Sequence, residues 1–164
     1  MGNCESVIQY ITQLGIEYKL YEHPPLPTIE IAVKYWQDLE ARHCKNLFFR
    51  NHKGNRHFLV VLDFRQNLDI HDLERRLKQG KISFASAERM EKYLGLKPGS
   101  VSPFGLINDT SNHVHLFLDE NLKGSKFVSF HPNDNRFTLV IKFEDFERYL
   151  LSTGNAYEYI KLYD

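Results

Sequence analysis

The stretch that decides the fold is Gly95-Leu96-Lys97-Pro98-Gly99-Ser100-Val101-Ser102-Pro103-Phe104-Gly105-Leu106-Ile107-Asn108. Its three glycines and two prolines exclude a long helix or strand, yet too many of its residues are apolar for a solvated linker. We therefore expect a rigid, buried loop, in which Gly99 lets a ligand approach the backbone and Pro103 fixes the turn. The N–H groups between them could point at a carbonyl or a phosphate. An ordinary surface turn is the competing interpretation.

Length and charge are those of an ordinary globular protein. The chain has 164 residues, enough for a real core, and we expect a single domain over residues 1–164. Its 21 Lys and Arg balance its 21 Asp and Glu, which excludes the broad basic field that drives non-specific nucleic-acid binding. An RNA partner is therefore expected to use local patches, such as Arg42/His43, Arg50/Lys53 and Lys123/Lys126.

The location expected from the sequence is cytoplasmic. No apolar run is long enough to span a membrane, and no signal-peptide pattern opens the sequence. Cys4 and Cys44 have no metal-ligand spacing. We expect them to be small, partly buried side chains rather than a disulfide.

Hydrophobic periodicity predicts an α+β domain with a mixed, mostly antiparallel sheet. Helices are expected over residues 3–14, 28–37, 69–79, 86–94 and 143–151. Strands are expected over residues 17–21, 44–50, 56–64, 113–118, 126–130 and 136–142. The tyrosine-rich tail, 154–164, is expected to dock on the body of the domain.

A few polar residues stand where they could carry chemistry. Lys45 opens a strand of core residues and could present a fixed positive charge, although a snorkelling lysine is the plainer alternative. His131 and Asn133 lie in a tight turn between two strands, where Asn133 could equally bond the turn backbone. His113 and His115 share a strand face, but a zinc site needs three or four ligands and no further ligand has a supporting spacing. No serine lies in a nucleophile-elbow pattern, so a serine hydrolase is not expected.

Three motifs occur together in order: Lys45-Asn46-Leu47-Phe48, Gly99-Ser100-Val101-Ser102-Pro103-Phe104-Gly105 and Phe130-His131-Pro132-Asn133. With Tyr21-x-His23-Pro24 and residues 24–30, they resemble the YbaK/ProX family of aminoacyl-tRNA deacylases, the editing domain also inserted in bacterial prolyl-tRNA synthetases. The resemblance extends over nearly the whole chain. Asn46 after the lysine resembles the freestanding ProX branch, which clears alanine from proline tRNA, more than the cysteine-clearing YbaK branch. Cys44 before the lysine is a departure.

The resemblance implies a fold and a site. The fold would be a pseudo-barrel sheet surrounded by helices, with no metal and no cofactor. Lys45, Gly99 and His131 would be catalytic, and residues 99–103 would form the Gly-x-x-x-Pro substrate loop. The substrate-binding residues would be His23, Pro24, Thr28, Asn46, Ser100, Val101, Ser102, Pro103, Phe104 and Asn133.

The function implied by the resemblance is trans-editing, in which water hydrolyses the ester of alanine mischarged on proline tRNA. An aminoacyl ester beside its own ammonium group is already reactive, so positioned water and a stabilised oxyanion suffice without a protein nucleophile. Two alternatives stay open: a deacylase for mischarged cysteine or serine, and a non-catalytic module that binds the tRNA acceptor end. The expected partner is the acceptor end of proline tRNA, with prolyl-tRNA synthetase or an elongation factor as a transient partner.

Overall fold

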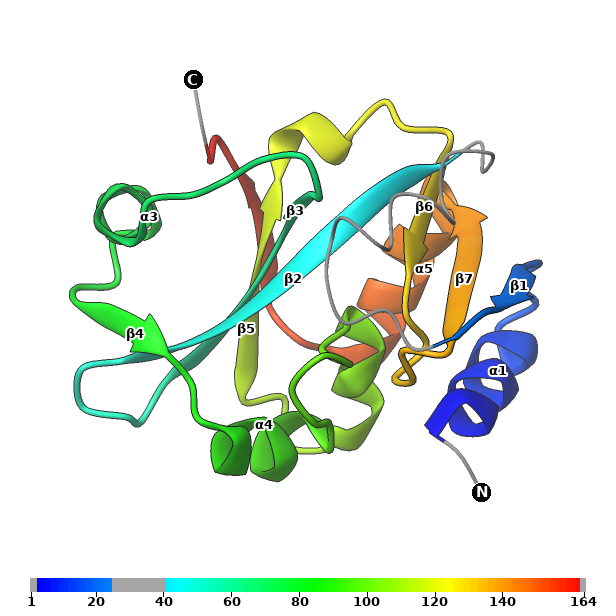
Figure 1. Ribbon diagram of the computed structural model, residues 1–164, viewed down its shortest axis with the longest axis horizontal. Helices are drawn as coiled ribbons and strands as arrows, with labels where there is room; N and C mark the ends of the chain where they lie inside the picture. Colours follow the sequence, from blue (N-terminus) through cyan, green and yellow to red (C-terminus); the bar gives the residue numbers. More distant parts are fainter. Residues whose placement is uncertain (1–2, 25–40, 163–164) are drawn as a thin grey trace.

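A mixed eight-stranded sheet forms the centre of the computed structural model, which describes residues 3–24 and 41–162 (Figure 1). The strand order is β1-β7-β6-β2-β3-β5-β8, and β4 pairs with β2 outside this path. The strands are β1 (Lys19–Glu22), β2 (Arg42–Asn51), β3 (His57–Asp63), β4 (Ile82–Phe84), β5 (Val114–Asp119), β6 (Phe127–Phe130), β7 (Phe137–Lys142) and β8 (Tyr157–Ile160).

Antiparallel and parallel pairs alternate in blocks across the sheet. β2 pairs antiparallel with β3 and β4, and β7 pairs antiparallel with β1 and β6. The pairs β2–β6, β3–β5 and β5–β8 are parallel. The long strand β2 therefore joins two half-sheets, one made with β6, β7 and β1 and the other with β3, β5 and β8. The α+β class and the mixed sheet predicted from the sequence are confirmed.

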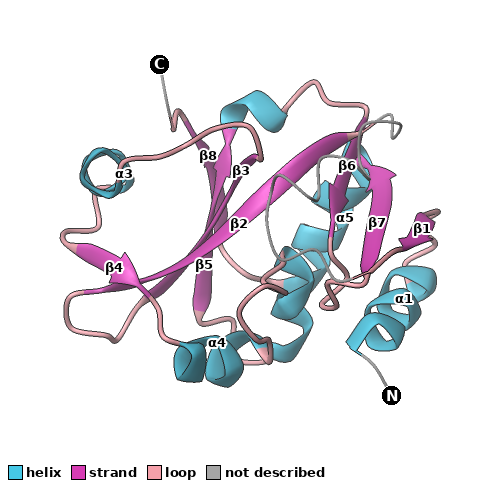
Figure 2. Ribbon diagram, in the orientation of Figure 1, coloured by secondary structure: helices cyan, strands magenta, loops and turns pink. Residues whose placement is uncertain are grey.

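More of the described helices pack on one face of the sheet than on the other (Figure 2). The helices are α1 (Asn3–Gln13), α3 (Ile70–Leu77), α4 (Ala87–Leu94) and α5 (Phe143–Thr153), with 3-10 turns η1 (Pro103–Asn108) and η2 (Glu120–Leu122). The first hydrophobic cluster includes buried residues of α1, α4, η1 and α5, so these elements share one face of the sheet. The second cluster includes Leu73 and Leu77 of α3 and lies on the opposite face, against β2, β3 and β5.

Local sequence signals explain the ends of two helices. Asp69 accepts hydrogen bonds from the N–H groups of His71 and Asp72 at the start of α3, and Ser86 accepts one from Arg89 N–H at the start of α4. Gly95 ends α4 in the left-handed conformation, so the helix stops at Leu94, where the predicted range ended. α3 ends earlier than predicted, because Lys78 rather than Gly80 adopts the left-handed cap.

Two strands were not predicted. β4 is a three-residue strand on the edge of β2, and β8 lies in the tail, where it pairs parallel to β5. The tail thus docks as a sheet strand. The helix predicted over 28–37 lies outside the described residues. No helix among those described is long and apolar enough to cross a membrane.

His57, at the start of β3, gives the fold a testable pH dependence. The residue is 1% exposed, its Nε2 is 3.0 Å from Arg89 Nη1, and its Nδ1 is 2.8 Å from His113 Nε2. Burial, together with the charges of His113 and Arg89, lowers the pKa of His57 to about 4. An unfolded histidine has a pKa of about 6.5, so unfolding takes up a proton between these two values.

The contribution of neutral His57 to the free energy of unfolding is therefore full above pH of about 6.5 and is lost as the pH falls toward about 4. We expect urea titrations at pH 7 and pH 4.5 to show a smaller pH effect in His57→Gln than in the unsubstituted protein. His52→Gln, at an exposed position of the same hairpin, is the control. An equal pH effect in all three proteins would contradict this account.

Candidate active site

Strand β2 turns Lys45 and Asn46 to opposite faces of the sheet, because successive residues of a strand alternate. Cys44 and Phe48 belong to the first cluster, so Asn46, which lies between them, faces that cluster. The Asn46 Oδ1 is buried and has no hydrogen-bond partner in the part of the chain that the structure describes. Lys45 faces the other side, where its Nζ donates to Asn67 Oδ1 at 3.5 Å. The two residues that the resemblance assigns to one site thus point into different spaces.

The face of β2 that carries Lys45 continues onto β6. His43 pairs with Ser129 across these two parallel strands, and His43 Nδ1 is hydrogen-bonded to Ser129 Oγ. Two residues further along, on the same face, come Lys45 on one strand and His131 just beyond the other. The strands diverge from there (Figure 1). Lys45 and His131 therefore lie on the same face of the sheet, Lys45 on β2 and His131 just after β6.

His131 is held by the backbone of the neighbouring strand. Its Nδ1 is 2.8 Å from the carbonyl oxygen of Phe137, to which it must donate, and its ring centroid is 6.1 Å from that of His23. Burial lowers the pKa of His131, and the charge of His23 lowers it further, against the opposing effects of the Phe137 carbonyl and Asp134. Neutral His131 thus carries its proton on Nδ1, which makes Nε2 a hydrogen-bond acceptor.

His23 joins the same polar face from the end of β1. Its Nε2 is 2.8 Å from the hydroxyl oxygen of Thr138, and its Nδ1 is 2.9 Å from the carbonyl oxygen of Pro24. Since Nδ1 must donate to that carbonyl, Nε2 of the neutral ring accepts from Thr138. Thr138 is 1% exposed, so this bond fixes the His23 ring beside His131.

The loop over residues 99–103 packs against the turn that begins at His131. Asn133, whose φ of 61° is left-handed, donates from Nδ2 to the Phe104 carbonyl at 3.2 Å. Tyr149 of α5 donates to the Pro103 carbonyl at 2.8 Å from the other side. Ser102 accepts a hydrogen bond from Phe104 N–H at the start of η1. The loop is therefore rigid and buried at Ser102, Pro103 and Phe104, as the sequence predicted.

A small cavity marks the junction between loop and turn. It has a volume of about 240 Å³, and Leu96, Lys97, Ser100, Asn133 and Asp134 are among its lining residues. Ser100 is half-buried there. Phe104 instead lies in the first cluster, where its ring packs near Phe130 and Tyr149. Phe104 can thus support the loop from behind.

Two opposing effects act on the pKa of the Lys45 ammonium group. Burial lowers the pKa of Lys45, and the charge of Asp63 partly offsets this effect. A partly desolvated ammonium interacts more strongly with an anion than a fully hydrated one does. The position at the mouth of the sheet therefore suits electrostatic stabilisation of a developing negative charge.

The structure packs the turn of His131 and Asn133 against the 99–103 loop, and it places Lys45 on the same face of β2 as His43, which pairs with Ser129 of β6. His23 and Pro24 join them at the end of β1. Val101 is half-buried and packs against the first cluster, and Thr28 lies outside the described residues. No group of three or more His, Cys, Asp or Glu among the described residues could hold a metal ion; His113 and His115 pair with His57 and Glu158 instead.

Two polar residues near this face, Ser129 and Thr138, were not singled out from the sequence, and His43 was named only as part of a possible RNA-binding patch. Thr138 stands in the otherwise apolar run Phe137-Thr138-Leu139-Val140-Ile141, and a polar residue in a buried strand is a usable signal. The contact between His43 and Ser129 depends on the register of β2 against β6, which no local pattern contains.

Gly99 offers a matched test of the loop. Its φ is +91°, but an added Cβ would meet nothing closer than Asn135 Nδ2 at 3.8 Å; Gly124 has a φ of +89° and open space around it. We expect Gly99→Ala and Gly124→Ala to lower the free energy of unfolding equally, by about 1–2 kcal/mol each. Only Gly99→Ala should slow hydrolysis of an aminoacyl-tRNA ester. Equal rates in the two variants would show that Gly99 matters for stability alone.

Comparison with known proteins identifies the family. The model of the aminoacyl-tRNA editing domain matches residues 23–149. The chain is 42% identical to the prolyl-tRNA editing protein ProX of Acetoanaerobium sticklandii over 162 residues, which is 99% of each chain. It is 30% identical to prolyl-tRNA synthetase associated domain-containing protein 1 of Bos taurus, over 90% of this chain and 88% of that one.

A solved structure shares the fold. The protein, assigned to trans-editing for prolyl tRNA synthetase, matches with a TM-score of 0.68 and 21% identity, over 97% of this chain and 94% of that chain. The matched residues 23–149 include Lys45, the 99–103 loop and the turn of His131. The chain therefore belongs to the aminoacyl-tRNA editing domain family, and it is an aminoacyl-tRNA hydrolase.

Proposed function

We propose that this protein acts in trans on proline tRNA and hydrolyses the ester of mischarged alanine. The observation that carries the proposal is that Lys45 of β2 and His131, just after β6, lie on one face of the sheet, with the turn of His131 packed against the 99–103 loop. The relative from Acetoanaerobium sticklandii, similar over its whole length, is named a prolyl-tRNA editing protein. Its name supports prolyl-tRNA editing as the function here.

In the proposed reaction, a water molecule attacks the ester carbonyl. Backbone groups of the 99–103 loop orient the ester, and Lys45 stabilises the oxyanion that develops on the carbonyl oxygen. The acceptor atom Nε2 of His131 helps to orient the amino acid or the water. The ribose 2′-OH of the terminal adenosine assists proton transfer to the leaving 3′-oxygen.

The small binding free energy of a methylene group explains why a separate editing pocket is needed besides the synthetase pocket. A synthetase pocket that holds proline cannot sterically reject the smaller alanine, and each missing methylene changes binding by only about 1–3 kcal/mol. A smaller pocket that admits alanine and excludes proline supplies the missing discrimination. We propose that Val101 and Pro24 narrow this pocket.

The test is a panel of tRNA esters. The protein is incubated separately with alanyl-, cysteinyl-, seryl- and prolyl-tRNA, all on proline tRNA, and ester loss is followed with labelled amino acid. We expect alanine to be released at least about 100-fold faster than proline. Faster release of cysteine or serine would change the substrate assignment. Stable binding of every ester without release would favour a non-catalytic acceptor-end module.

A further inference from the structure

A second cavity lies at the end of the sheet where β2 begins and β3 ends. Its volume is about 340 Å³, and Arg42, Asp63, Arg65, Glu120, Asn121 and Lys161 line it. The lining cations outnumber the two carboxylates. None of these residues belongs to the site described above.

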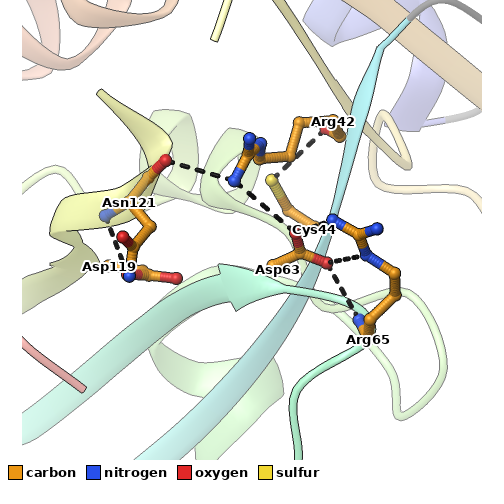
Figure 3. A network of polar contacts seen from close by, with 6 residues as sticks. All are labelled: Arg42, Cys44, Asp63, Arg65, Asp119 and Asn121. Carbon is orange, nitrogen blue, oxygen red and sulfur yellow. Dashed lines mark hydrogen bonds and ion pairs between the residues drawn. The ribbon is translucent and has the colours of Figure 1, made fainter. Parts of the chain in front are cut away.

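Buried Asp63 fixes two arginines at the wall of this cavity (Figure 3). Asp63 is 2% exposed, and Arg65 binds both of its oxygens, from Nε at 3.2 Å and from Nη2 at 2.9 Å. Arg42 Nη1 lies 3.6 Å from Asp63 Oδ2 and also donates to the Asn121 carbonyl at 3.2 Å. Burial alone would raise the pKa of Asp63, but the hydrogen bonds from Arg65 lower it overall.

One guanidinium is enough to neutralise one carboxylate. Here Arg42 and Lys161 line the same cavity as Arg65, so three cationic side chains meet the two carboxylates of Asp63 and Glu120. Arg42 and Arg65 are both held in place before any ligand arrives, and arginine is the side chain best suited to phosphate oxygens. Glu120 is exposed, where solvent screens its charge.

The cavity and Lys45 lie toward the same end of β2. Arg42 and Lys45 are three residues apart, about 10 Å along the strand, and alternation places their side chains on opposite faces. The segment after β3 reaches both places, since Arg65 binds Asp63 while Asn67 contacts Lys45 Nζ. A chain of nucleotides whose terminal ester lies at Lys45 would therefore bring its phosphates close to this end of the sheet.

We propose that the cavity of Arg42, Arg65 and Lys161 is a subsite for a backbone phosphate of the single-stranded 3′ end of the tRNA substrate. The proposal rests on the function proposed above and places the phosphate contact beside the ester site. Asp63 acts as a positioning residue that holds the two arginines. Because a phosphate contact carries no base information, the subsite adds affinity without choosing among tRNA sequences.

The first test measures binding of uncharged tRNA and needs no hydrolysis. Arg65→Gln and Lys161→Gln are compared with the unsubstituted protein by fluorescence anisotropy between 50 and 200 mM salt. Each variant is expected to weaken binding about three- to tenfold and to reduce the slope of log K against log salt by about 0.7, as loss of one single-strand phosphate contact requires. Arg148→Gln is the matched control, because Arg148 is an exposed arginine that pairs with Asp145 on α5.

The second test separates the subsite from the reaction. Arg65→Gln should raise KM for alanyl-tRNA about three- to tenfold and change kcat little. The defect should disappear with 3′-alanyl-adenosine, which has no phosphate. An equal defect on both substrates would mean that Arg65 only supports the fold, and it would overturn the proposal. Arg65 is 68% exposed, so the variant is expected to fold; thermal unfolding checks this.

The outcomes distinguish this proposal from the proposed function. If no ester is hydrolysed but the salt slope falls in both variants, the function is wrong and the subsite stands. If the variants bind tRNA with unchanged affinity and slope, the subsite is wrong. A CCA trinucleotide should compete with the tRNA, whereas inorganic phosphate at equal ionic strength should not. Competition by phosphate alone would mean a site for a free anion and would also overturn the proposal.

Discussion

Replacing Lys45 with alanine is expected to slow single-turnover hydrolysis of alanyl-tRNA by at least about 100-fold. Loss of one group that stabilises a developing oxyanion has a cost of this order. Lys45 is half-buried, and burial lowers its pKa, so its charge acts at short range rather than through bulk water. The measurement is rapid mixing of excess enzyme with labelled alanyl-tRNA, followed by acid quench.

Two controls separate chemistry from folding in the Lys45→Ala variant. The free energy of unfolding, measured by urea titration, should change by less than about 1 kcal/mol, because a partly exposed lysine contributes little to stability. Lys81→Ala, at an exposed position before β4, should leave the rate unchanged. Undiminished hydrolysis in Lys45→Ala would refute the role proposed for this residue.

Replacing His131 with alanine is expected to slow hydrolysis by about 10- to 100-fold and to remove the acid limb of the pH–rate profile. Loss of a group that orients the water or the amino acid is expected to cost less than loss of a proton-transfer group, which costs on the order of 100-fold or more. Because burial lowers the pKa of His131, the ring is neutral at pH 7 and Nε2 accepts. Protonation at lower pH turns Nε2 into a donor, so kcat/KM should fall as the pH drops through that lowered pKa.

The profile is measured as kcat/KM between pH 4.5 and 8 for the unsubstituted protein, for His131→Ala and for His71→Gln. His71 is 86% exposed on α3, so its variant should keep both the rate and the acid limb. An acid limb that persists unchanged in His131→Ala would show that another group causes it.

Local signals predicted most of the fold. The hairpin of β2 and β3 follows from two β-rich runs around the turn-forming residues Asn51 to Asn55, and caps at Asp69 and Ser86 mark α3 and α4. β4 was missed because three residues carry too little periodicity. β8 was missed because its pairing with β5 connects segments about 40 residues apart, which short-range patterns do not contain.

The candidate site was predicted from motifs, and its geometry needed the structure. The motifs named Lys45, the 99–103 loop and His131, but they did not show that alternation on β2 separates Lys45 from Asn46. That separation follows from the period of a strand and was available from the sequence. The placement of Lys45 on the same face as His131 was not, because it depends on the pairing of His43 with Ser129 between distant segments.

The position of the substrate ester tests the account most directly. A crystal structure with a non-hydrolysable amide analogue of 3′-alanyl-adenosine would show it. We predict the alanyl carbonyl between Lys45 and the turn of His131, with its oxygen within hydrogen-bonding distance of Lys45 Nζ and its other side against the 99–103 loop. An analogue bound on the opposite face of the sheet, beside Asn46 and away from Lys45, would contradict the account.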